Sequence, residues 1–73
     1  MLNKRLLLSK MALNGDNQGD LAVAVGLTPT RFSAKLNSVG GATFTPKEMV
    51  KIKVRYNLTD EEFMSIFFKH FVS

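Results

Sequence analysis

Helix-start signals recur along this chain and divide it into short helices. A threonine–proline pair stands at residues 28–29 and again at 45–46, and this pair places a hydroxyl at the N-cap and a ring of fixed φ at the first helical position. A threonine followed three residues later by a glutamate stands at 45–48 and 59–62, which is the spacing of a capping box. These signals predict helices that begin at residues 29, 46 and 60.

The remaining residues also have the pattern of helices and turns. The leucine-rich stretch 3–13 is followed by a turn sequence, and Asn17 is an N-cap for a helix that Gly26 ends. No segment alternates as a strand does and no segment repeats. The predicted helices span 3–13, 17–25, 29–37, 46–56 and 60–71. Because 73 residues leave no room for a linker and a second domain, we expect one compact all-α domain over residues 1–73.

The composition argues against several classes of chemistry. The chain has no cysteine and a single histidine, His70, which is expected to be a packed residue rather than a metal ligand. The acidic residues are scattered or lie at helix starts, so no pair of carboxylates indicates acid–base catalysis. We therefore expect no enzyme, no metal and no cofactor. No apolar run is longer than the five residues 21–25, and Lys10 interrupts the N-terminal apolar stretch, so we expect neither a membrane span nor a cleaved leader.

The net charge favours a polyanionic partner. Ten lysines and arginines oppose six acidic residues, which gives a charge of +4 and an isoelectric point near 9.8. Residues 1–57 carry nine of the bases and three of the acids, whereas 58–73 carry one base and three acids. The modest excess is also compatible with a small basic protein that is merely soluble.

Successive side chains of an α-helix are rotated by about 100° around its axis, so the spacing of apolar residues identifies the buried face of the last two predicted helices. In 46–56 this face comprises Met49, Ile52 and Tyr56, and a roughly opposite basic stripe comprises Lys47, Lys51 and Arg55. In 60–71 it comprises Phe63, Ile66, Phe67 and His70. Phe68 and Val72 are predicted to point away from that face. The last helix is therefore expected either to be deeply buried or to meet a second protein.

The segment 18–37, QGDLAVAVGLTPTRFSAKLN, has the pattern of two helices that cross at a tight turn. Its core positions are occupied by Leu21, Val25, Phe32 and Leu36, with the small Ala22 at the expected crossing and Gly26-Leu27 at the turn. The segment resembles the helix-turn-helix of the Cro/CI family of phage regulators, over about residues 17–37. Residues 44–52 and 57–68 resemble the tail of small regulators from temperate phages of Gram-positive bacteria. One departure is Lys35, which stands where many members have an apolar residue.

The resemblance implies a five-helix, lambda-repressor-like domain whose third helix enters the major groove of DNA. The implied DNA-binding residues are Gln18, Thr30, Arg31, Ser33, Ala34, Lys35, Asn37 and Lys47. Arg31 is the candidate for a bidentate guanine contact, and Ala34 is limited to a thymine methyl. Phosphate contacts are expected from Gln18, Lys35, Asn37 and Lys47. This is a thin reading surface, because one bidentate pair supplies about 1–3 kcal/mol of discrimination.

Because few side chains are expected to contact base edges, a second function of the same family is also considered. A modulator of repression is an antirepressor that binds the N-terminal domain of the cognate CI repressor and keeps it off operator DNA. Its apolar anchors here would be Phe32, Val39, Phe44 and Phe68, although Phe32 is also a candidate core residue and Phe44 a hydrophobic staple. This function is narrowly favoured over an autonomous Cro-type repressor. Either would act in the bacterial cytoplasm, near the nucleoid, without a membrane or a small-molecule substrate.

Overall fold

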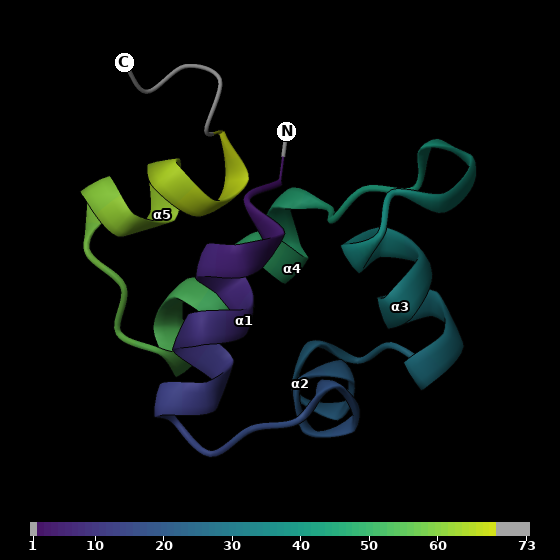
Figure 1. Ribbon diagram of the computed structural model, residues 1–73, viewed down its shortest axis with the longest axis horizontal. Coiled ribbons are helices and arrows are strands. Elements are labelled where there is room, and N and C mark those ends of the chain that lie inside the picture. The colour runs from purple at the N-terminus through teal and green to yellow at the C-terminus, as the bar shows by residue number, and fades with distance from the viewer. Residues whose placement is uncertain (1, 69–73) are drawn as a thin grey trace.

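The computed structural model describes residues 2–68 and is entirely helical over that range (Figure 1). Its elements are α1 (Lys4–Leu13), α2 (Gln18–Val25), α3 (Pro29–Leu36), the 3-10 turn η1 (Val39–Gly41), α4 (Pro46–Arg55) and α5 (Asp60–Phe67). The prediction of an all-α chain with five α-helices is therefore confirmed for residues 2–68, with four of the helices within one residue of their expected bounds.

The last helix is shorter than predicted. The α5 helix ends at Phe67, and Phe68 leaves helical geometry with a φ of −135°. The Phe68 side chain is half-buried and packs against the core, with its ring 6.1 Å from that of Phe63. The prediction that Phe68 points away from the core is therefore wrong, because the change in backbone direction turns its ring back toward Phe63. His70 and Val72 lie outside the described residues.

Local capping explains where the helices begin. The hydroxyls of Thr28, Thr45 and Thr59 each accept a hydrogen bond from the backbone N–H three residues later. Both predicted capping boxes form, since the Glu48 and Glu62 carboxylates accept from the N-cap backbone N–H at 2.9 Å. A further capping box, which the sequence patterns had not indicated, joins Asn17 and Asp20 at the start of α2.

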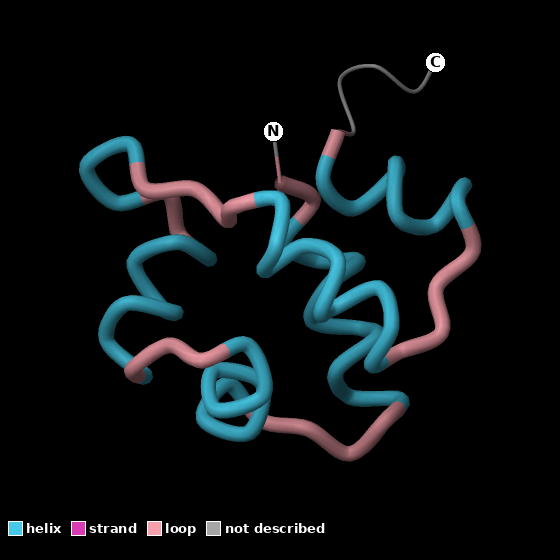
Figure 2. The backbone as a smooth tube through the Cα atoms, turned by 180° about the vertical axis from the view of Figure 1, so that it is seen from behind, coloured by secondary structure: helices cyan, strands magenta, loops and turns pink. Residues whose placement is uncertain are grey.

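A single apolar cluster draws side chains from all five helices. Its buried members are Leu7, Met11, Leu21, Ala22, Val25, Phe32, Leu36, Phe44, Ile52, Tyr56, Leu58, Ile66 and Phe67. Aromatic rings bridge the two halves of the molecule, because the Phe44 ring lies 5.5 Å from Phe32 and 6.2 Å from Phe67. In both backbone views α3 and α5 lie on opposite sides of the molecule, with α1 and α4 between them (Figures 1 and 2).

A polar network fastens the loop after α1 to the end of α4. The Asp16 carboxylate accepts hydrogen bonds from Arg55 Nε and Nη2 at 2.7 and 2.8 Å and from the Tyr56 hydroxyl at 2.8 Å. The Arg55 guanidinium, and then the Tyr56 hydroxyl, lower the pKa of Asp16 to about 2. Burial and the neighbouring carboxylate raise the pKa of Tyr56. The network therefore joins residues about forty positions apart.

Candidate macromolecule-binding face

The α2 and α3 helices form a unit whose apolar positions point inward as the sequence predicts. The α2 helix ends at Gly26, whose φ of 79° lies in the left-handed region that glycine adopts without strain. The Leu27 N–H donates to the Ala22 carbonyl at 2.9 Å, which closes the turn as in a Schellman motif. Ala22 and Phe32 are completely buried, so both helices are anchored and the opposite face of α3 is left outside.

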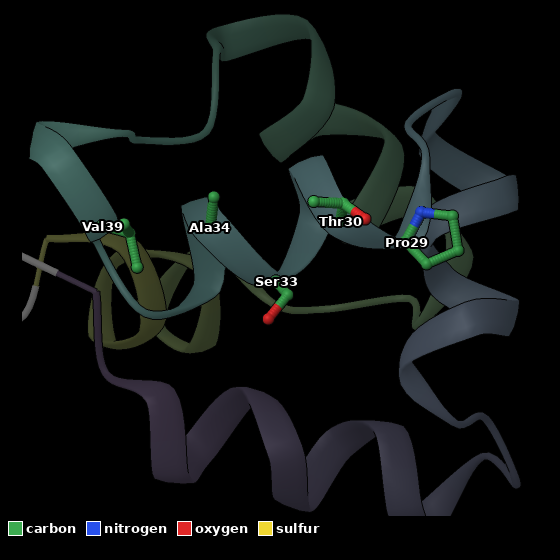
Figure 3. Close-up of a pocket in the computed structure, with 5 residues that line it drawn as sticks. All are labelled: Pro29, Thr30, Ser33, Ala34 and Val39. Carbon is green, nitrogen blue, oxygen red and sulfur yellow. The ribbon is translucent and has the colours of Figure 1, made fainter.

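The outward face of α3 borders a shallow depression of about 500 Å³. Its lining residues are Pro29, Thr30, Ser33, Ala34 and Val39 (Figure 3). The first four come from α3 and Val39 from the turn that follows it, where its side chain is 62% exposed. The lining is mostly apolar, with two hydroxyl groups. The depression is wide open to solvent, so the face is accessible to a partner's side chains.

The side chains of Gln18, Arg31 and Lys47, which are among the predicted polar contact residues, remain available. Arg31, Gln18 and Lys47 are exposed, and none of their side chains forms a hydrogen bond or ion pair with another residue among 2–68. Gln18 and Lys47 stand at the first turns of α2 and α4, where backbone N–H groups favour anions. These three side chains therefore offer donors to a phosphate, a base edge or a carboxylate.

Lys35 is not available, and its prediction as a phosphate contact is wrong. Its Nζ lies 2.8 and 3.0 Å from the two carboxylate oxygens of Glu48, and the two side chains are only 11% and 12% exposed. Burial alone would raise the pKa of Glu48, but the bonds from Lys35 and the Thr45 N–H outweigh it and lower that pKa. A cation is stable at this otherwise apolar position of α3 because Glu48 on α4 neutralises it.

Asn37 is exposed at the end of α3, but its amide is already engaged. Its Nδ2 donates to the Ser33 carbonyl at 2.9 Å, and its Oδ1 accepts from the Lys4 ammonium. This bond brings Lys4, on α1, to the end of α3. The sequence patterns did not indicate Lys4 as a site residue, because no local spacing relates it to a residue 33 positions away.

Two of the predicted protein-binding anchors belong to the core instead. Phe32 is completely buried, which confirms the alternative prediction that it is a core residue. Phe44 is 95% buried, so the prediction that these two side chains contact a partner is wrong. The loop before α4 inserts the Phe44 ring between Phe32 and Phe67, which is why it is covered. Phe68 is half-buried, and Val39 alone of the four predicted anchors is strongly exposed.

Within residues 2–68, no three histidine, cysteine, aspartate or glutamate side chains are grouped as metal ligands would be. None of the helices in that range is both long enough and apolar enough to cross a membrane.

Comparison of the chain with protein-family models, with curated proteins and with solved structures found no match.

Proposed function

We propose that this protein is a modulator of repression, an antirepressor that binds the N-terminal domain of a CI-type phage repressor through the outward face of α3. In this proposal α2 and α3 are the helix-turn-helix of a lambda-repressor-like domain. The protein then promotes lytic growth by interfering with the repressor's operator binding in the bacterial cytoplasm, without catalysing a reaction.

The observation that carries the proposal is the apolar lining of the α3 depression. A helix that reads the major groove needs side chains that match base-edge donors and acceptors. The depression on the outward face of α3 offers the hydroxyls of Thr30 and Ser33 among the apolar Pro29, Ala34 and Val39, and Arg31 is not part of its lining. Such a lining suits the apolar core of a protein interface better than a polar base edge.

The charge of the chain limits how it could act on a repressor. A protein that occupied a DNA-binding surface by imitating DNA would be strongly acidic, whereas this chain carries +4. Contact through shape and apolar burial, with Arg31 at the flank to meet a carboxylate, is compatible with that charge.

The second candidate function is an autonomous Cro-type repressor that binds operator DNA. The exposed side chains of Gln18, Arg31 and Lys47, which form no hydrogen bond or ion pair with another residue among 2–68, favour it, because they offer the donors that phosphate and base contacts need. Such a protein needs two recognition helices about one helical turn of DNA apart, and therefore a dimer.

Purified full-length protein and the N-terminal domain of the cognate repressor distinguish the two functions. We expect a stable heterocomplex in size-exclusion chromatography with light scattering, and loss of the repressor's operator binding when the protein is added. The Val39→Asp variant should weaken the complex at least about tenfold, because it places a carboxylate on the apolar face. Val54→Asp is the matched control, since Val54 is an exposed valine that does not line this depression.

The antirepressor proposal is contradicted if the protein and the repressor domain form no heterocomplex. If the protein alone instead binds operator DNA as a dimer, with an affinity that falls steeply with salt and is lost in Arg31→Ala, the Cro-type function is correct.

A further inference from the structure

A second accessible apolar surface lies between α2 and α4. It is a groove of about 550 Å³, hereafter the α2–α4 groove, and it is lined by Ala24, Val50, Lys51, Val54 and Arg55. It shares no lining residue with the α3 depression. Val50 is 53% exposed and Val54 is 74% exposed, although a valine is a residue type that proteins usually bury.

The α4 side chains at the groove form two parallel rows. Val50 and Val54 lie one helical turn apart, and Lys47 and Lys51 lie one turn apart on the adjacent strip of the same helix. Within residues 2–68 no carboxylate pairs with either lysine, whereas Arg55 is held by Asp16. Lys51 extends toward the α2–α3 turn: a Cβ atom added to Gly26 would lie 3.9 Å from the Lys51 Nζ. An apolar row therefore lies beside two lysines that have no carboxylate partner within residues 2–68.

From this arrangement we propose that the α2–α4 groove is a docking site for an acidic amphipathic helix of another protein. Apolar side chains of such a helix, spaced one turn apart, would pack against Val50 and Val54. Its flanking carboxylates would meet Lys47 and Lys51. The lining of this groove shares no residue with the α3 depression, so this proposal does not rest on the proposed antirepressor function, although Lys47 is also a phosphate contact in the Cro-type alternative.

Charge complementarity argues against the other occupants of such a groove. A second copy packed groove to groove would bring Lys47 and Lys51 close to their own counterparts, which is repulsive. DNA or an anionic membrane would satisfy the lysines. However, DNA or a membrane would not need two exposed valines one helical turn apart in a groove between helices. A helix docked in the groove would pack its apolar side chains against these two valines.

The proposal is tested with a synthetic peptide of about 16 residues, long enough to form a helix, with leucines on one face and glutamates on both flanks. The full-length protein is labelled with ¹⁵N, and the peptide is titrated while the amide chemical shifts are recorded. We expect saturable binding that shifts amides of α2 and α4 and weakens as the salt concentration rises. An isomer of the peptide with its leucines scattered around the helix should bind far more weakly.

Two variants test the two rows separately. Val54→Asp and Lys51→Glu should each lower the affinity for the peptide at least about tenfold. Both side chains are exposed, so neither change disturbs the core, and circular dichroism checks the helix content of each variant. Val39→Asp should leave peptide binding unchanged, and Val54→Asp should leave repressor binding unchanged, so the two proposals fail separately.

Three results would overturn the proposal. These are the absence of saturable binding, equal binding of the scattered isomer, and tighter binding of phosphatidylglycerol vesicles or of a short DNA duplex through the same α4 residues. The last result would assign the lysines to a lipid or nucleic-acid surface.

Discussion

Replacing Lys35 by methionine tests whether the contact between α3 and α4 depends on a buried ion pair. The two side chains are about nine-tenths covered, so removal of the ammonium leaves the Glu48 carboxylate largely buried without its counter-charge. Breaking a fully buried pair in this way costs about 3–5 kcal/mol. Here the carboxylate keeps its bond from the Thr45 N–H and some contact with water, so we expect a loss of about 2–3 kcal/mol.

This loss is large against the total stability of the chain. A protein of this size unfolds with a free energy of about 4–11 kcal/mol. We therefore expect the melting temperature of Lys35→Met to fall by about 10–20 °C, measured by circular dichroism at neutral pH, with urea denaturation giving the free energy. Adding Glu48→Gln should restore most of the loss, because glutamine keeps the capping bond to Thr45 and carries no charge.

The matched control is Lys51→Met, which removes an equivalent charge from an exposed position of α4 and should change the stability by less than about 0.5 kcal/mol. If Lys35→Met and Lys51→Met are equally stable, Lys35 is not held by a buried carboxylate. Lys35 is then again a candidate phosphate contact.

Two further predictions concern the loop network and the crossing of α2. The folded-state pKa of Asp16, about 2, lies below its ordinary value of 3.8, so the stabilisation by this carboxylate is complete above pH 3.8 and is lost as the pH falls toward 2. An NMR titration should show that Tyr56→Phe raises the pKa of Asp16, and an unchanged pKa would mean that the hydroxyl does not contribute. Ala22→Val should lower the free energy of unfolding in urea by about 1–3 kcal/mol, because Ala22 has no exposed surface and added methyl groups must displace its neighbours. A variant as stable as the wild type would show that the crossing has spare room.

The sequence alone predicted the parts of the fold that depend on neighbouring residues. Helix starts at Thr28, Thr45 and Thr59 were predictable because an N-cap hydroxyl satisfies an N–H only three residues away. The inward positions of Leu21 and Phe32 followed from helical spacing, because a residue one turn along the chain lies on the same face.

Contacts between distant residues were decided only by the tertiary structure. The sequence left Phe44 as a candidate partner anchor, whereas in the structure the loop before α4 places its ring between Phe32 and Phe67. The sequence left Lys35 as a candidate phosphate contact, whereas in the structure it pairs with Glu48 of another helix. Burial and ion pairing depend on which surfaces pack together, and no local spacing encodes that. The sequence therefore determined the helices and their inward faces, whereas the packing of those helices determined which polar and apolar groups remain available to a partner.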